Sequence, residues 1–184
     1  MRSQVIAFAG SLRKGSYNRC LIENSKRLAP EGMEFEHVFL DDVPLYNTDV
    51  ETEKFPEAVV RLKEQIRAAD GVLMAVPEHN FSFSAVLKNV TEWLSRPPRE
   101  NSVLENKPVI LQSASTSWSG GLRAQLHLHQ TLNYFPVRLM RFPEVCVGNC
   151  ATKFDDTGIL IDEPTVKRIQ TQLESFQQFM RGEG

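Results

Sequence analysis

Short apolar runs alternate along this 184-residue chain with longer segments whose apolar residues repeat at helical spacing. The run GVLMAV (71–76) contains no polar side chain, which is typical of a strand covered on both faces of a parallel sheet. The other expected strands are 4–9, 33–39, 109–111, 137–140 and 144–147, and the expected helices are 18–28, 57–69, 84–95, 121–133 and 164–180. This alternation predicts a single α/β domain over residues 1–184, with a mainly parallel sheet.

The charge balance indicates no polyanionic partner. The chain has 21 basic and 23 acidic side chains, a formal net charge of −2, which gives no reason to expect binding to nucleic acid or to an anionic membrane surface. Its apolar runs are too short to span a bilayer, and MRSQ leads straight into a strand rather than into a signal sequence. We therefore expect a cytoplasmic protein with no nucleic-acid partner and no membrane insertion.

Three cysteines, Cys20, Cys146 and Cys150, do not form the even, dense set of a secreted disulfide scaffold. Cys146 and Cys150 lie close in sequence, but no second Cys or His pair accompanies them. We expect packed thiols here and no metal site.

The loop after the first strand has the composition of a phosphate-binding loop. Ligands of parallel α/β sheets bind beyond the carboxyl ends of the strands, and GSLRKGSYN (10–18) lies there, directly before a helix whose N-terminal amides favour an anion. It lacks the Lys and Ser/Thr that complete a P-loop, and Leu12 stands where a dinucleotide fingerprint needs its second glycine. The loop therefore favours a terminal monophosphate. A polar loop that only caps the helix is the alternative.

A second polar loop, PEHNFSF (77–83), follows the buried run at the same expected edge. Its backbone amides can hydrogen-bond the edge of a heteroaromatic ring, with His79 or Phe81 alongside, whereas a loop shaped by turn chemistry alone is the alternative. His79 also suggests a general base. No carboxylate partner for it can be identified, so we expect it to line a ring rather than to catalyse.

The third loop, SASTSWSGG (113–121), combines small residues, which let a flat ligand approach the backbone, with hydroxyls for its polar rim. Ser115 is flanked by Ala114 and Thr116, so the G-x-S-x-G elbow of hydrolases is absent. A hydrolase or NTPase is therefore the weaker interpretation.

Together these motifs resemble the NADPH-dependent FMN reductases, and within them the quinone and chromate reductase branch. The motifs are GSLRKGSYN (10–18), PLYN (44–47), PEHNFS (77–82), LKNVTEWLSRP (87–97) and SGGLRAQLH (119–127). The resemblance covers essentially the whole chain. It implies a flavodoxin-like fold, a doubly wound five-stranded parallel sheet of order 2-1-3-4-5 with helices on both faces, and FMN bound without a covalent link.

The resemblance also assigns residues to FMN. The residues that would hold its phosphate are Ser11, Arg13, Ser16 and Asn18, in a loop completed by Leu12, Lys14, Gly15 and Tyr17. Those that would line the isoalloxazine ring are Pro77, Glu78, His79 and Asn80, with Ser115 contacting the flavin from the third loop.

The implied activity is hydride transfer from NADPH or NADH through FMN to a small-molecule electron acceptor, with no catalytic side chain and no metal. Quinones are the first acceptor class; chromate, azo or nitro compounds and ferric complexes are further ones. A flavodoxin-like electron carrier or redox sensor, without NAD(P)H turnover of its own, is the alternative function.

Relatives in the resembled family form homodimers and homotetramers. Arg123 and Gln125 match positions near the tetramer interface, and Phe81 or Phe83 is expected to face a partner chain. The alternative is an exposed polar helix face with two core phenylalanines.

Two residues depart from the pattern of the family. His79 replaces the usual Tyr of P-E-Y-N, and an imidazole can titrate near neutral pH, so His79 is a candidate modulator of acceptor preference or pH dependence. Trp118 replaces a smaller or aliphatic residue, and would either narrow the acceptor site or cover an interface.

Overall fold

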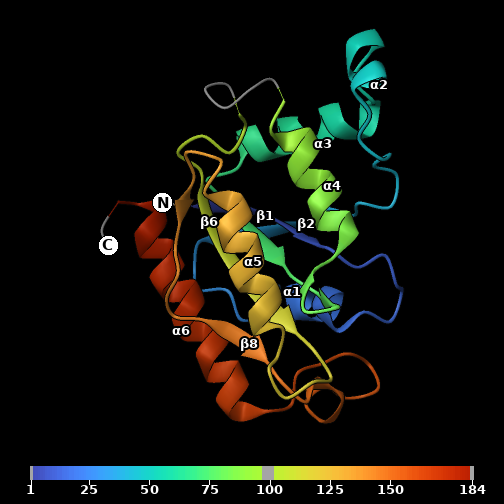
Figure 1. Ribbon diagram of the computed structural model, residues 1–184. Coiled ribbons are helices and arrows are strands. Elements are labelled where there is room, and N and C mark those ends of the chain that lie inside the picture. Colours follow the sequence, from blue (N-terminus) through green and yellow to red (C-terminus); the bar gives the residue numbers. More distant parts are fainter. Residues whose placement is uncertain (1, 97–101, 183–184) are drawn as a thin grey trace.

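A parallel sheet runs through the middle of the protein in the computed structural model, which describes residues 2–96 and 102–182 (Figure 1). Its strands are β1 (Ser3–Ala9), β2 (Met33–His37), β3 (Gly71–Ala75), β6 (Pro108–Ala114), β7 (Arg138–Leu139) and β8 (Val145–Val147). The hydrogen-bonded order is β2-β1-β3-β6-β7, and β8 pairs with β6 further along the same strand. The expected order 2-1-3-4-5 is confirmed, with β7 and β8 sharing the fifth position.

The fifth strand is divided because the segment between β7 and β8 contains Pro143, whose nitrogen cannot donate to a ladder. β7 pairs with the start of β6, where Val109 lies opposite Leu139. β8 pairs with its end, where Ala114 lies opposite Val147. Two short ladders thus replace the continuous strand of an ideal flavodoxin-like sheet.

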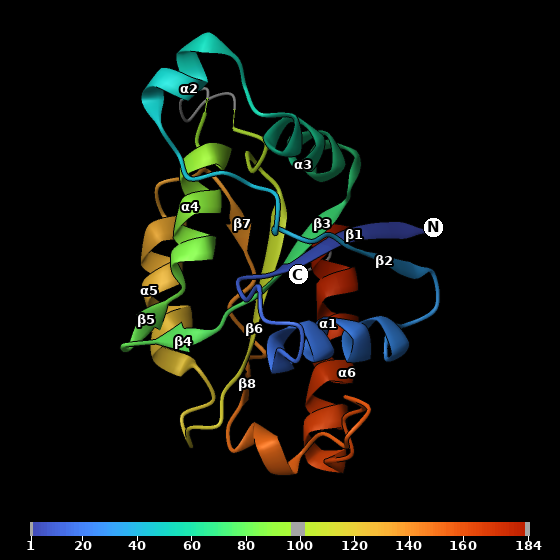
Figure 2. The same cartoon turned by 90° about the vertical axis from the view of Figure 1, so that its right-hand side faces the viewer.

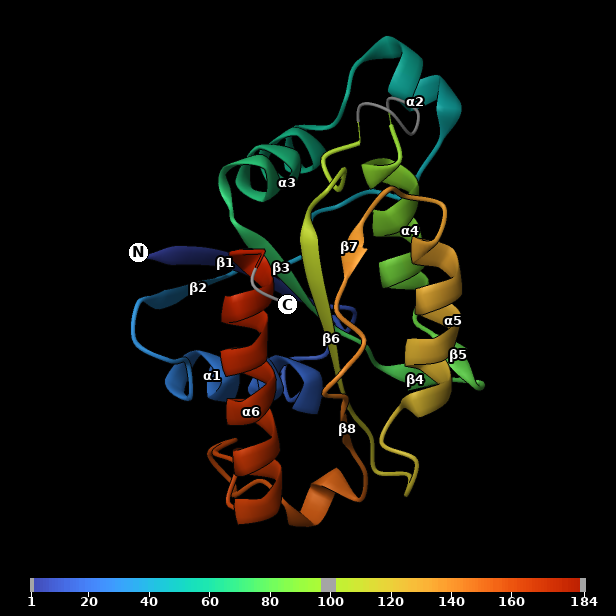
Figure 3. The same ribbon diagram turned by 90° about the vertical axis from the view of Figure 1, so that its left-hand side faces the viewer.

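Helices cover both faces of the sheet, as Figures 2 and 3 show from opposite sides. They are α1 (Tyr17–Arg27), α2 (Thr48–Glu53), α3 (Glu57–Ala68), α4 (Ala85–Leu94), α5 (Leu122–Leu132) and α6 (Glu163–Met180), with a short 3₁₀ turn at Cys150–Thr152. Helices α1 and α6 lie over one core and α3, α4 and α5 over the other. Within the described residues, no helix is both long and apolar enough to cross a membrane.

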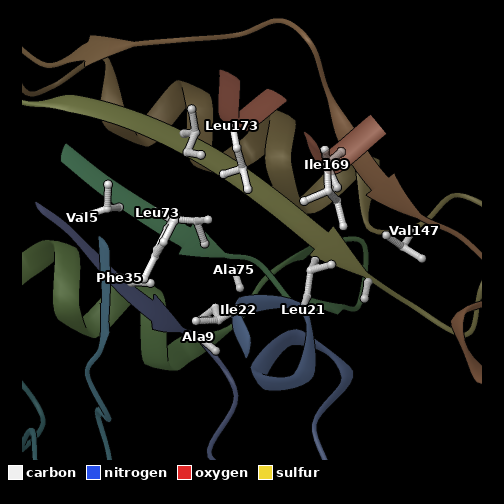
Figure 4. Close-up of a cluster of buried hydrophobic side chains, with 14 of the residues drawn as sticks. Val5, Ala9, Leu21, Ile22, Phe35, Leu73, Ala75, Val147, Ile169 and Leu173 are labelled. Atoms are coloured by element: carbon white, nitrogen blue, oxygen red, sulfur yellow. The ribbon is translucent and has the colours of Figure 1, made fainter. Parts of the chain in front are cut away.

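Side chains alternate between the two faces of each strand, so one apolar run contributes to both cores. In β3, Leu73 and Ala75 face the core under α1 and α6, whereas Val72 and Met74 face the other core. Figure 4 shows the first core, in which Leu73 lies among side chains from β1, α1 and α6. Burial on both faces explains why the run 71–76 contains no polar side chain.

The structure contains two features that the sequence analysis did not predict. β4 (Glu78–His79) and β5 (Ser82–Phe83) form a small antiparallel hairpin, and α2 lies between the second strand and α3. The side chain of Asn47 caps α2 by accepting from the amide of Asp49 at 2.9 Å, and no residue of α2 is buried. A helix without a buried face has no apolar period to reveal it. Pro97, the last residue of one family motif, lies outside the described residues.

Candidate cofactor site

Three polar loops converge at the carboxyl ends of β1, β3 and β6, the edge where a doubly wound sheet binds its ligand. They enclose a small cavity of about 170 Å³. Its wall consists of Ser11, Arg13, Ser16, Tyr17, Asn18, Pro77, Glu78, His79, Ala114, Ser115 and Thr116. Most of the residues predicted for FMN therefore come together. Leu12, Lys14, Gly15 and Asn80 lie in the same loops, exposed and outside that wall.

The first loop ends in a helix terminus that is suited to an anion. Ser16 is the N-cap residue of α1 and is buried, but its side chain makes no capping hydrogen bond. The amides of the first helical turn have no intrahelical acceptors, and they lie beside the exposed cation of Arg13, whose guanidinium carbon is 6.0 Å from the ring centroid of Tyr17. Hydroxyls, free amides and one cation make this terminus a fit for a phosphate group.

Arg19 holds the first loop from behind, a role that the sequence analysis missed. Its Nε donates to the carbonyl oxygen of Ser11 at 2.8 Å, and its Nη2 donates to both carboxylate oxygens of Asp41, at 3.0 and 2.8 Å. The guanidinium also lies 5.1 Å from the ring centroid of Phe39. No sequence signal marks this role, because Asp41 and Phe39 come from the loop after the second strand.

Asn18 lines the cavity, but its side chain is committed to the sheet. Its Nδ2 donates to the carbonyl oxygen of Ala114 at 3.0 Å, and its Oδ1 accepts from the amide of the same residue at 3.1 Å. Both polar atoms of the Asn18 side chain therefore join the first loop to the start of the third. Nδ2 carries a second hydrogen that the bond to Ala114 does not use, so binding of the phosphate by the Asn18 side chain stays a prediction. The backbone N–H of Asn18, in the first turn of α1, is a second candidate donor to an anion.

The second loop is the β4–β5 hairpin, whose turn has positive φ angles at two residues, Asn80 (50°) and Phe81 (65°). Two-residue turns of this kind favour Asn-Gly, and a bulky side chain in this conformation is strained by about 1–2 kcal/mol. His79 is exposed beside the cavity. The turn therefore follows directly on three residues of the cavity wall, Pro77, Glu78 and His79.

The carboxylate of Glu78, a residue of the cavity wall, is bound to α5. Only 8% of it is exposed, its Oε1 lies 3.6 Å from Nη1 of Arg123, and its Oε2 accepts from the amide of Ala124 at 3.4 Å. Glu78 therefore lies in the cavity wall while its carboxylate binds the first turn of α5.

The third loop is fixed by its own hydroxyls and by the segment after β8. Ser115 Oγ accepts from the amide of Ser117 at 3.1 Å, and the backbone of Ser115 bonds to Val147 and to Cys150. Gly121 has a φ of 89°, and a Cβ there would lie 2.7 Å from Cβ of Ser113, so this close approach needs glycine. Trp118 is 78% exposed and does not belong to the cavity wall.

The two thiols near this loop have raised pKa values. Burial raises the pKa of Cys150 to about 11, and it also raises the pKa of Cys146 above its usual value. A thiolate is the nucleophilic form of cysteine, so both residues stay protonated at neutral pH. The expectation of packed thiols agrees with this finding, and the described cysteines are all free.

Gln125 does not match its expected place at an oligomer interface. Its side chain is inside the protomer, where Nε2 donates to Ser113 Oγ and to the carbonyl oxygen of Val145, both at 2.8 Å. Phe83 packs against the core under α3, α4 and α5, whereas Phe81 is 65% exposed. Of these residues, Phe81 and the part-exposed Arg123 remain on the surface.

The arrangement therefore fits a ligand with a monophosphate at one end and a flat, hydrogen-bonding ring at the other. The monophosphate would meet the α1 terminus, and the ring would lie against the second and third loops. FMN has this chemistry, and the cavity residues fit it.

Comparison with known proteins agrees with this fit. The sequence model of the NADPH-dependent FMN reductases matches residues 3–152. An NAD(P)H-dependent FMN reductase of Pseudomonas aeruginosa is 42% identical over 178 residues, covering 97% of this chain and 95% of that protein. A quinone reductase of Escherichia coli K12 is 41% identical over 181 residues, covering 97% and 95%.

A solved structure extends the likeness to three dimensions. The flavoenzyme NAD(P)H:(acceptor) oxidoreductase FerB from Paracoccus denitrificans is 31% identical, has a TM-score of 0.89 and covers 99% of both chains. Sequence, fold and site geometry agree. The chain belongs to the family of NADPH-dependent FMN reductases.

Proposed function

We propose that this protein is an FMN-dependent NAD(P)H oxidoreductase that reduces quinones. The observation that carries the proposal is the N-terminus of α1, whose first-turn amides, lacking a side-chain cap, face a cavity that also contains Arg13 and the ring-lining loops. Relatives about 40% identical over nearly the whole chain are FMN and quinone reductases.

The first loop would hold the phosphate of FMN. The first-turn amides of α1 and the hydroxyls of Ser11 and Ser16 would donate hydrogen bonds, and Arg13 would supply the opposite charge. Arg19 would keep the loop in place through the carbonyl of Ser11.

The other two loops would hold the ring. Main-chain groups of residues 77–80 and the hydroxyl of Ser115 would bond its polar edge, with His79 at the rim. Bound FMN supplies the two-electron chemistry, accepting hydride from NAD(P)H and returning electrons to an acceptor. The residues of the second and third loops would orient the ring.

Quinone is the proposed acceptor class because several relatives that match nearly all of this chain are quinone reductases. A carrier without NAD(P)H turnover is not favoured, since the relatives are nicotinamide-dependent enzymes. We also propose that the enzyme acts in the cytoplasm.

We further propose that the protein assembles as a homodimer or homotetramer through the face around α5. Phe81, Leu122 and Leu126 are 65%, 37% and 51% exposed, and an interface on this face would cover these apolar side chains. Light scattering coupled to size exclusion should give a mass at least twice 20.9 kDa, and a monomer would refute this proposal.

The activity is tested by two anaerobic half-reactions. Protein loaded with FMN is mixed with NADPH while flavin absorbance near 450 nm is followed, and benzoquinone is then added. The proposal predicts rapid bleaching, then recovery on addition of quinone. Bound flavin that NADPH does not bleach would instead support the carrier, and failure to bind FMN would refute both functions.

A further inference from the structure

The carboxylate of Glu78 takes the place of a helix cap for α5. The N-cap residue of α5 is Gly121, which has no side chain to accept a hydrogen bond. Glu78, from the β4–β5 hairpin, accepts from the amide of Ala124 in the first turn and places a negative charge where the helix dipole favours one. Glu78, the first residue of the hairpin, thus attaches the hairpin to the first turn of α5.

Arg123 holds the same hairpin at two points. Its Nη1 lies 3.6 Å from Oε1 of Glu78, and its guanidinium carbon lies 4.4 Å from the ring centroid of Phe81. Ser82 Oγ adds a contact of 3.1 Å to Nδ1 of His127 on the next turn of α5. Figure 2 shows β4 and β5 lying against α5.

The turn that these contacts hold has an unfavourable backbone conformation at Phe81. Phe81 has a φ of 65°, in the left-handed region that favours glycine, and its side chain is largely exposed. Because an isolated two-stranded hairpin is at best marginally stable, contacts with α5 are needed to hold this one. Arg123 contacts the strand before the turn through Glu78 and the turn itself through Phe81.

We propose that Glu78 and Arg123 are positioning residues that preorganise the β4–β5 hairpin for FMN. Arg123 lies outside the cavity wall, so it acts through Glu78 and Phe81 on the main chain of residues 77–80. The inference rests on the proposed FMN site and adds that the ring-binding main chain is held in place by α5 before the cofactor binds.

The test uses Arg123→Met, which keeps the length of the side chain and removes its charge. Hydrogen exchange of the peptide covering residues 78–83 is measured in the apo-protein, and FMN affinity is measured by quenching of flavin fluorescence. Arg123→Met should speed exchange in this peptide about tenfold and raise the FMN Kd about fivefold. Arg123→Lys, which keeps the charge beside Glu78 but not the planar stack, should recover most of the affinity, to within about twofold.

Arg61→Met is the matched control, because Arg61 forms an exposed ion pair with Asp42 at 2.5 Å, away from the cavity wall. In Arg61→Met, hydrogen exchange of the peptide covering residues 78–83 and the FMN Kd should both equal the wild-type values. Exchange of the strands β1 and β3 should be unchanged in all variants, which separates a loosened hairpin from a misfolded protein.

A double-mutant cycle tests whether the two residues act as one unit. Glu78→Gln keeps an acceptor for Ala124 but removes the charge that Arg123 meets, so Glu78→Gln combined with Arg123→Met should weaken FMN no more than the worse single change. If the double variant raises the FMN Kd by the product of the two single effects, the two residues act independently and the pairing is overturned.

Normal exchange in Arg123→Met would overturn the inference, as would faster exchange with an unchanged FMN Kd. Both results leave the proposed function intact, because the wild type still binds FMN. A wild type that binds no FMN is a different result, and it overturns the proposed function together with this inference.

Discussion

At the scale of single residues, the motifs predicted which positions would meet but not which way each side chain would point. Asn18 and Glu78 both reach the cavity, yet the polar atoms of one bind Ala114 and those of the other bind the start of α5. These partners are 96 and 46 residues away in sequence, so only the assembled sheet brings them within reach. Local patterns carry no information about such contacts.

Asn18→Ala tests the structural role of this side chain. The substitution leaves the buried amide and carbonyl of Ala114 without partners, so the free energy of unfolding of the apo-protein should fall by about 2–3 kcal/mol. Urea denaturation measures the change, with exposed Asn133→Ala as the control. A loss below about 0.5 kcal/mol would mean that these two hydrogen bonds contribute little.

At the scale of elements, long apolar periods predicted the principal helices and strands. The short polar elements were not predicted. The β4–β5 hairpin has two residues in each strand and depends on α5, which no local pattern reveals. The division of the fifth strand into β7 and β8 likewise depends on its pairing with two separate parts of β6. The order of the strands followed from the family resemblance, not from periodicity.

The two glycines of the first loop differ in how closely other elements approach them. A Cβ on Gly10 would lie 2.5 Å from Cγ of Leu87 and 2.6 Å from Oγ of Ser84, at the start of α4. Gly10→Ala should therefore lower the free energy of unfolding by about 1–3 kcal/mol, because β1 and α4 must separate. A Cβ on Gly15 meets only Nη1 of Arg13, at 3.4 Å, so Gly15→Ala is the matched control and should change stability little. Equal thermal midpoints for the two variants would contradict this packing.

At the scale of the whole molecule, the near-neutral net charge gives no sign that a lysine is buried. Lys63 on α3 is 5% exposed, its Nζ donates to the carbonyl oxygen of Arg96, and it lies 4.4 Å from the ring centroid of Phe55. Burial lowers the pKa of Lys63 to about 8. The sequence EAVVRLKEQIRA shows this lysine only as one more charge on an amphipathic helix.

This lysine makes stability depend on pH in a defined direction. Between pH 8 and its ordinary pKa of 10.5, the folded protein binds fewer protons at Lys63 than the unfolded chain does, so its contribution to the free energy of unfolding rises with pH. The stability of the wild type relative to Lys63→Met should increase by about 2 kcal/mol across this window. Urea denaturation of both proteins at several pH values measures it, and a constant difference would contradict the lowered pKa.

The central claim is that the loop at the end of β1 binds the monophosphate of FMN. The most direct test compares the affinity of the apo-protein for FMN and for riboflavin, which lacks only the phosphate. Several charge-assisted hydrogen bonds at the α1 terminus should make FMN bind at least about 100-fold more tightly. Equal affinities would show that this terminus does not hold the phosphate, and would contradict the account.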